Sequence, residues 1–366
     1  MKIPSRDQPM LFRPLTIRGV TIRNRIWVAP LCQYSVESRD GVPGDWHLVH
    51  LGSMAAGGAG LVVAEASAIS PEGRISDKDT GIWNERQRDA WSRIVAFLHS
   101  QGAIAGIQLA HAGRKASVWP EWGTGRDGTM AVEDGGWSTV SASSVPFGNY
   151  DAPVALDLAG INEVVSDFVR AAIRSVEAGF DLLELHAAHG YLLHQFLSPL
   201  SNLRDDEYGG SLENRERLLL RVVREVRAAV GTEVPVLVRF SATDYTEGGW
   251  DEQQTATVAA WARAAGADLF DISSGGNISG ATIPVSAGYQ VRFAEYVRMH
   301  GGVQTSAVGL ITTAGQAEEI LQSGRADAVF LGREMMRDPH FGLRAAHELG
   351  TDLDYWPSQY LRAKWR

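Results

Sequence analysis

The sequence predicts an α/β fold, a (β/α)8 barrel in which eight parallel strands alternate with helices. The main observation is a set of short apolar runs that recur with helix-like stretches between them. Eight such runs are present, at residues 25–30, 60–67, 103–110, 181–186, 234–241, 268–274, 303–309 and 328–332. Their near-continuous apolar character is typical of parallel strands buried on both faces. Strands that alternate with helices favour a barrel, and a doubly wound open sheet is the competing arrangement.

The stretches between these runs carry the amphipathic pattern of helices. The clearest of them cover residues 162–178, 211–230, 252–265 and 313–323. Ser211 follows two glycines and is a candidate helix N-cap, because its hydroxyl can accept a hydrogen bond from a free backbone N–H.

Residues 112–156 interrupt this alternation. They are rich in Gly, Pro and Trp and show no long helical pattern. Loops of this length are uncommon in compact domains and are usually functional or mobile. We therefore expect a long excursion after the third strand, at the active-site end of the barrel.

The composition limits the classes of protein to consider. A chain of 366 residues is long enough for one α/β barrel, so we expect a single domain over residues 1–366. The 34 Lys and Arg against 43 Asp and Glu give a net charge of −9 without a block of like charge. This argues against nucleic acid and an anionic membrane as partners. The single cysteine, Cys32, excludes internal disulfides and cysteine-rich iron–sulfur sites.

The same composition bears on location. There is no apolar signal region at the start of the chain. No apolar run approaches the roughly 18 residues that span a bilayer. We expect a soluble protein of a reducing cytoplasm.

Two imidazoles and a phenol follow the fourth predicted strand within six residues: His186, His189 and Tyr191. The histidine pair could be structural or could hold a metal ion. A metal ion needs a third ligand, and no His or carboxylate of matching spacing follows, so we expect no metal. Two hydrogen-bond donors beside a proton donor suit a reaction in which a carbonyl oxygen gains negative charge and a carbon gains a proton.

Other polar residues also come at the ends of predicted strands, where barrel enzymes place their catalytic groups. They are Cys32, Gln108, Arg239 and the pair Gly332-Arg333. Although these residues are far apart in the sequence, the fold should bring them together with His186.

The sequence also indicates how a cofactor could bind. No GxGxxG motif follows a predicted strand, which argues against a separate dinucleotide-binding domain. A barrel can hold a mononucleotide flavin with its phosphate at the loops after strands seven and eight. Gly309 and Gly332 lie at these two places and permit close backbone approach. Arg333 can bind a phosphate with two hydrogen bonds.

Residues 186–199 and 202–215 together closely resemble the signature of the old yellow enzyme family of FMN-dependent ene reductases. Residues 29–34, 63–66 and 108–116 extend the match along the chain and resemble a bacterial subclass that includes the xenobiotic reductases. That subclass has Cys and Tyr where this chain has Cys32 and Tyr34, and a His/His pair where other members have His/Asn.

The resemblance implies a flavin site and a mechanism. It implies FMN as the cofactor and NADPH or NADH as the hydride donor, in a ping-pong reaction that passes hydride to the β-carbon of an activated alkene. Enones, nitroalkenes and maleimides are the implied substrates. His186 and His189 would bind the substrate oxygen with help from Tyr34, and Tyr191 would protonate the α-carbon. The implied flavin contacts are Ala29, Pro30, Leu31, Cys32, Ala64, Gln108 and Arg239, with Gly309, Gly332 and Arg333 added for the phosphate. For Cys32 the alternative is an inert small core residue.

The C-terminal segment, residues 351–366, is rich in aromatic and cationic side chains, which are enriched at protein interfaces. The resemblance implies that this segment crosses a dimer interface and contributes Arg362 or Tyr360 to the neighbouring active site. We expect a homodimer or a tetramer of such dimers. Packing of the segment against its own barrel is the alternative.

Three other functions remain to be weighed. A dienoyl-CoA reductase would need an iron–sulfur cluster and further domains, which one cysteine and 366 residues do not provide. A metal-dependent barrel hydrolase would use His186 and His189 as ligands. A flavin-binding protein without catalytic activity is the third alternative function.

Overall fold

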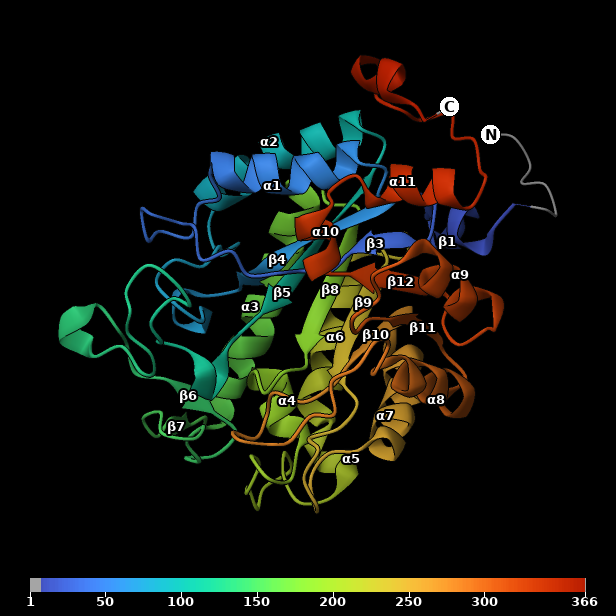
Figure 1. The fold of residues 1–366 in the computed structure, drawn as a ribbon. Coiled ribbons are helices and arrows are strands. Elements are labelled where there is room, and N and C mark those ends of the chain that lie inside the picture. The colour runs from blue at the N-terminus through green and yellow to red at the C-terminus, as the bar shows by residue number, and fades with distance from the viewer. Residues whose placement is uncertain (1–7, 366) are drawn as a thin grey trace.

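The computed structural model describes residues 8–365, and these form a closed barrel of eight parallel strands surrounded by helices (Figure 1). Each barrel strand pairs with the next barrel strand along the chain, and the last pairs with the first. The strands are β3 (Ile26–Val28), β4 (Leu61–Ala68), β5 (Ile104–Ala110), β8 (Leu182–Ala187), β9 (Val236–Ser241), β10 (Leu269–Ser273), β11 (Gln304–Ala307) and β12 (Ala328–Leu331). They are the eight predicted strands, with ends that differ by at most two residues. The barrel is confirmed and the doubly wound sheet was wrong.

The helices lie outside the barrel, between successive strands (Figure 1). They are α1 (Asp45–Ala56), α2 (Glu85–Ser100), α3 (Leu158–Glu177), α4 (Leu192–Leu197), α5 (Leu212–Arg215), α6 (Arg217–Val230), α7 (Glu252–Ala265), α8 (Val291–Gly301), α9 (Ala314–Gln322), α10 (Arg333–Arg337) and α11 (Phe341–Glu348). The prediction for α7 is correct at both ends. The predicted helix 211–230 is two helices, because the hydrogen-bond pattern breaks at Glu216 although its backbone stays right-handed helical. Ser211 caps α5 as predicted, since its hydroxyl accepts from Asn214 N–H at 3.4 Å.

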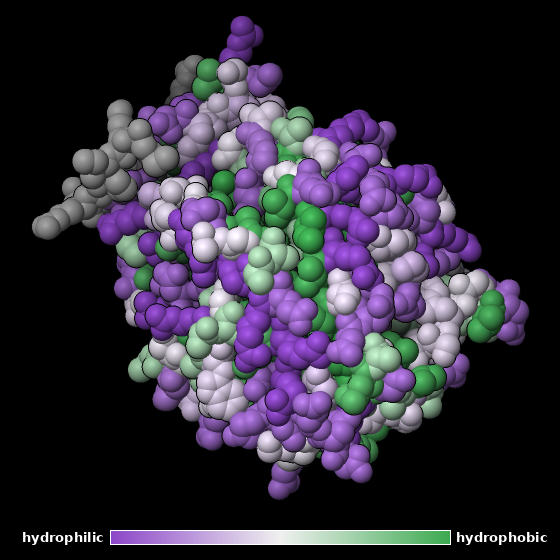
Figure 2. Space-filling model, turned by 180° about the vertical axis from the view of Figure 1, so that it is seen from behind, coloured by the Kyte–Doolittle hydropathy of each residue, from purple (hydrophilic) through white to green (hydrophobic). Residues whose placement is uncertain are grey.

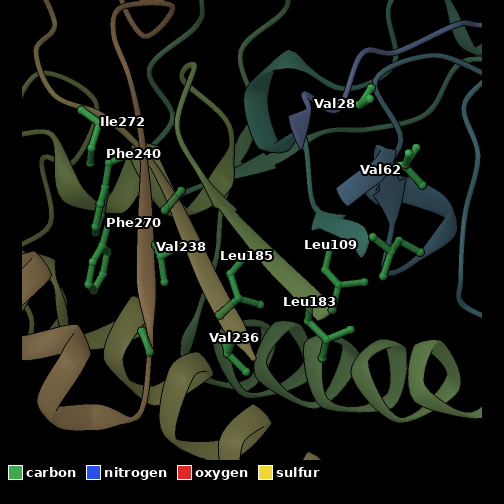
Figure 3. Packing of buried hydrophobic residues seen from close by; sticks show 14 of the residues in the cluster. Val28, Val62, Leu109, Leu183, Leu185, Val236, Val238, Phe240, Phe270 and Ile272 are labelled. Atoms are coloured by element: carbon green, nitrogen blue, oxygen red, sulfur yellow. The ribbon is translucent and has the colours of Figure 1, made fainter. Parts of the chain in front are cut away.

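The strands bury their two faces against different partners, because successive side chains of a strand point to opposite sides. Figure 3 shows the outward face, where apolar side chains pack between the strands and the helices. Phe240 on β9 and Phe270 on β10 stack there with ring centroids 5.9 Å apart. This layer, rather than local propensity alone, holds the helices against the barrel.

The inward face forms a second apolar cluster at the end where the strands begin. A hairpin of β1 (Leu15–Ile17) and β2 (Val20–Ile22) packs its apolar side chains on this end. Trp27, Leu61, Leu182, Leu237 and Leu269 fill the interior there, and none of them is accessible to solvent. In the described residues 8–365 this end of the barrel is therefore closed by packed hydrocarbon, which leaves the other end for a ligand.

The excursion expected at 112–156 is present between β5 and α3. It contains two single-turn 3-10 helices and the two-residue strands β6 (Val140–Ser141) and β7 (Val154–Ala155), and it has no α-helix. It projects to the left of the view in Figure 1, beside α4.

Seen from behind, hydrophilic side chains cover most of the surface and hydrophobic ones gather in a narrow band (Figure 2). Within residues 8–365, the structure has no helix that is both long and apolar enough to cross a membrane. The start of the chain, where we expected no signal region, lies in part outside the described residues.

Candidate active site

The interior of the barrel changes from apolar to polar along its strands. Three neighbouring strands repeat one pattern on their inward faces: a leucine, then a charged residue, then a residue able to donate a hydrogen bond. The inward residues are Leu182, Glu184 and His186 on β8, Leu237, Arg239 and Ser241 on β9, and Leu269, Asp271 and Ser273 on β10. The polar groups therefore accumulate at the carboxyl end of the barrel, where active sites of this fold lie.

His186 and His189 face each other at this end. His186 ends the inward row of β8, and His189 follows in a turn with a left-handed backbone (φ 56°). Nε2 of His186 lies 3.4 Å from Nδ1 of His189. The fold thus brings the two predicted imidazoles together, with one ring nitrogen of each facing the other.

In each histidine, the ring nitrogen that faces away from the other ring makes a hydrogen bond that indicates which nitrogen carries the proton. Nδ1 of His186 accepts from the N–H of Ala188 at 3.2 Å, so its proton belongs on Nε2. Nε2 of His189 lies 2.8 Å from the Ser273 hydroxyl, which itself accepts from Gln290 Nε2. Ser273 can then donate its own proton to His189, which leaves the proton of His189 on Nδ1. Both facing nitrogens would then carry hydrogen, so the 3.4 Å contact between them is not a hydrogen bond in this state and each N–H is left for another acceptor.

The charge state of the pair follows from its surroundings. Burial lowers the pKa of His186 and of His189 well below the usual value, and the nearby Arg239 guanidinium lowers each further. Both imidazoles are therefore neutral at pH 7. A neutral pair of N–H donors can bind an oxygen that is becoming negative.

Tyr191 lies beside this pair. Its ring contacts the His186 ring edge-to-face with centroids 4.9 Å apart. Burial raises the pKa of Tyr191, and the neighbouring Cys32 and Asp79 raise it further, so the phenol keeps its proton. Tyr34 and Cys32 belong to the same apolar cluster as Tyr191, which places all three predicted residues together.

Inside the barrel, one layer below the histidines, two pairs of polar side chains are in contact. Gln108 on β5 donates from Nε2 to Oε1 of Glu184 at 2.7 Å. Burial raises the pKa of Glu184 to about 8. Arg239 Nε lies 2.9 Å from Asp271 Oδ2, but the two atoms are not aligned as a hydrogen bond, so the contact is an ion pair only.

A cavity of about 340 Å³ opens above these pairs, between β3 and the loops that follow β10, β11 and β12. Several predicted flavin residues line it together with His189: Ala29, Leu31, Arg239, Gly309, Gly332 and Arg333. Its volume is within the usual range for a small-molecule site.

Not every predicted residue faces this cavity. Ala64 on β4 packs its side chain in the outer layer between strands and helices, so only its backbone could reach a ligand. Gln108 lies in the layer beneath the cavity, and Pro30 and Cys32 lie near it on the chain that follows β3 without lining it.

Sequence reasoning missed several polar residues of this region. Glu184, Asp271 and Ser273 lie on the predicted strands but were not singled out. The signal was available, because each is the second or third inward residue of an otherwise apolar run. Gln290 had no such signal, since it precedes α8 outside any predicted strand.

The decisive comparison is with a family sequence model. Residues 10–352 match the model described as the NADH:flavin oxidoreductase / NADH oxidase family. The chain belongs to this family. A protein named NADPH dehydrogenase from Listeria monocytogenes is 47% identical over 354 residues, which cover 96% of this chain and 98% of that protein.

Solved structures agree with this assignment. Morphinone reductase is similar with a TM-score of 0.77 and 30% identity, over 94% of this chain and 91% of that one. An old yellow enzyme homologue from Zymomonas mobilis has a TM-score of 0.77 and 28% identity, and the match covers 97% of this chain and 98% of that one. The resemblance to the old yellow enzymes is confirmed, and the protein is a flavin oxidoreductase that uses FMN with NADPH or NADH. The hydrolase interpretation of His186 and His189 was wrong.

The cavity fits FMN on several observations. The side chain of Arg333 at its rim forms no hydrogen bond or ion pair with another residue of the described range 8–365, which leaves its guanidinium available to a phosphate. Gly309 has a φ of 110°, and a Cβ there would lie 2.8 Å from the Gln290 side chain. Oε2 of Glu184 is buried beneath the cavity without a hydrogen-bond partner. A phosphate would pair with the Arg333 guanidinium, and a polar ring edge would satisfy Glu184 Oε2.

The C-terminal segment divides into two parts. Leu353, Tyr355 and Trp356 pack against their own barrel. The following 3-10 helix, η5 (Ser358–Ala363), is exposed throughout, and it contains both Tyr360 and Arg362. In Figure 1 it lies at the top, far from α4 and the excursion. Neither Tyr360 nor Arg362 therefore belongs to the active site of its own chain.

Proposed function

We propose that this family member is an ene reductase that acts on activated alkenes such as enones, nitroalkenes and maleimides. The observation that carries the proposal is the pair of neutral imidazoles, His186 and His189, with facing nitrogens beside a protonated phenol. When bound, FMN supplies the hydride chemistry, taking hydride from NADPH or NADH and passing it to the alkene β-carbon in a separate half-reaction.

The imidazole pair would bind the oxygen of the substrate. A carbonyl or nitro oxygen that accepts from Nε2 of His186 and Nδ1 of His189 gains two donors in a largely buried site. Such donors stabilise the negative charge that develops on oxygen and cost little reorganisation. Tyr34, in the same cluster as Tyr191, is proposed to add a third hydrogen bond.

Tyr191 would supply the proton. Its raised pKa keeps the phenol protonated until the α-carbon of the substrate becomes basic. An overall addition of hydride and proton across the double bond needs no further acid.

The flavin contacts are proposed on the same resemblance and cavity. Ala29, Leu31, Arg239, Gly309, Gly332 and Arg333 would contact it from the cavity wall, and Ala64 through its backbone. Pro30, Cys32 and Gln108 would lie at the edge of the ring, with Gln108 oriented by Glu184.

Purification of the protein tests this function directly. The protein should be yellow, should bleach with NADPH or NADH in the absence of air, and should recover its colour when cyclohexenone is added. A protein that bleaches but does not recover with any of a panel of enones, nitroalkenes and maleimides would be a flavin oxidoreductase without ene reductase activity.

The exposed 3-10 helix η5 supports a shared active site. We propose a cytoplasmic homodimer, or a tetramer of such dimers, in which Arg362 or Tyr360 reaches the substrate pocket of the neighbouring chain. Tyr360 and Leu361 are 40% and 52% exposed, which leaves apolar surface for a partner. Deletion of residues 359–366 should weaken both oligomerisation and substrate binding while FMN stays bound. A truncated protein with unchanged oligomeric state and kinetics would rule this out.

A further inference from the structure

Lys115 has no role in the function proposed so far, although it lies next to the active site. It is the last residue of the 3-10 helix η3 (Gly113–Lys115), which follows β5 at the start of the excursion. Its side chain is largely enclosed, and it forms no ion pair with a carboxylate of residues 8–365. A lysine enclosed without a counter-charge is unfavourable unless other groups stabilise its ammonium.

The ammonium is held by two backbone carbonyls. Nζ donates to the carbonyl oxygen of His189 and to that of Gly276, each at 2.9 Å. These carbonyls belong to different loops, one after β8 and the other after β10. Lys115 therefore joins three segments of the active-site end at one atom.

The two joined loops are in direct backbone contact. A Cβ on Gly190 would lie 2.4 Å from the Gly276 carbonyl oxygen, and a Cβ on Gly276 would lie 2.8 Å from Cα of His189. The backbone of His189 at this contact is in the left-handed region, which is strained for a residue that is not glycine. It needs bonds that hold it, and the Lys115 bond to His189 is one of them.

Two aromatic rings complete the enclosure. Nζ lies 4.4 Å from the ring centroid of Phe147 and 5.2 Å from that of Tyr191. Contacts of this kind between a cation and a ring are attractive. Lys115 thus contacts the backbone of His189 and the ring of Tyr191.

We propose that Lys115 is a positioning residue that fixes His189 and Tyr191 relative to each other. It acts through these residues and does not touch the substrate, and the inference rests on the proposed function. Burial lowers the pKa of Lys115 to about 8, with a smaller effect from Arg114, so the ammonium form still dominates at pH 7.

The test compares Lys115→Met with Lys78→Met in the FMN-bound enzyme. Within residues 8–365 the side chain of Lys78 pairs with the exposed Glu37 alone, and its backbone hydrogen bonds are kept in the variant, so its replacement should change little. Lys115→Met should weaken binding of 4-hydroxybenzaldehyde, measured by calorimetry, and slow the alkene half-reaction, each by about tenfold or more. The NADPH half-reaction and the FMN content should stay near those of the control, because neither depends on the spacing of His189 and Tyr191.

A double variant separates positioning from general damage. If Lys115 acts partly through Tyr191, adding Lys115→Met to Tyr191→Phe should slow the alkene half-reaction less than it does in the wild type. Full additivity, or equal slowing of both half-reactions by Lys115→Met, would overturn the proposal.

Phe147→Leu is the second variant, for use if Lys115→Met does not fold. It removes one wall of the lysine enclosure and should slow the alkene half-reaction alone, by a smaller factor. An unchanged alkene half-reaction in Phe147→Leu would then overturn the proposal. If the wild type itself fails to react with cyclohexenone, the proposed function is wrong. If the wild type reacts and Lys115→Met matches the control, only the positioning proposal is wrong.

Discussion

The two ends of the barrel interior are built from the same strands but differ in the side chains that they bury, which are apolar at one end and charged at the other. At the closed end, Leu182, Leu237 and Leu269 are fully buried in hydrocarbon. At the open end, the next inward residues of the same strands are charged: Arg239 and Asp271 form a buried ion pair, and Glu184 Oε2 is buried without a hydrogen-bond partner. The first end stabilises the fold, and the second places charged groups, one of them with an unpartnered oxygen, beneath the ligand cavity.

The largest expected effect concerns the open end. Tyr191→Phe should slow the half-reaction with an enone by about 10²–10⁴-fold, the usual contribution of a positioned general acid. The half-reaction with NADPH should stay near normal, because only the alkene needs a proton on carbon. Stopped-flow measurements without air separate the two, and equal slowing of both would indicate a structural role for Tyr191.

A substitution at the closed end should have the opposite signature. Leu237→Ala removes a fully buried side chain and should lower the free energy of unfolding by about 2–5 kcal/mol. Urea unfolding of the FMN-bound enzyme measures this. Both half-reaction rates per bound flavin should be unchanged, and a variant of normal stability with slow half-reactions would contradict the division between the two ends.

A smaller effect should appear in the pH dependence of stability. In the folded protein the pKa of Glu184 is about 8, above its ordinary value of 4.5. The stability contributed by its proton is fully present below about pH 4.5 and is lost as pH rises through about 8.

Glu184→Gln does not titrate, so its free energy of unfolding should fall less steeply than that of the wild type between about pH 5 and 8. One proton gives a slope of at most about 1.4 kcal/mol per pH unit. Unfolding curves at several pH values measure the difference, and parallel profiles would show that the Glu184 carboxyl is ionised in the fold.

The same contrast explains what the sequence could predict. The strands were predictable because they are buried on both faces and therefore appear as unbroken apolar runs. The positions of His186, Gln108 and Arg239 followed from those strands, since barrel topology fixes where strand ends meet.

The remaining features depend on contacts between distant segments. Ala64 was expected at the flavin from the family resemblance, but alternation along β4 turns its side chain outward. The contact of Lys115 with His189 joins two loops that are 74 residues apart in the chain. The contribution of Arg362 to a neighbouring active site stays a prediction, since its surroundings in an oligomer depend on a second chain. No local pattern contains this information.

The most direct test of the central claim is the binding of a phenol, whose phenolate resembles the developing enolate, to His186→Ala and His189→Ala. Each variant loses one hydrogen bond to a charged group, worth about 1.5–3 kcal/mol, so calorimetry should show binding weakened by about 10- to 150-fold. FMN content should be unchanged, and Leu237→Ala should bind the phenol like the wild type. Normal phenol binding in both histidine variants would contradict the claim that this pair binds the substrate oxygen.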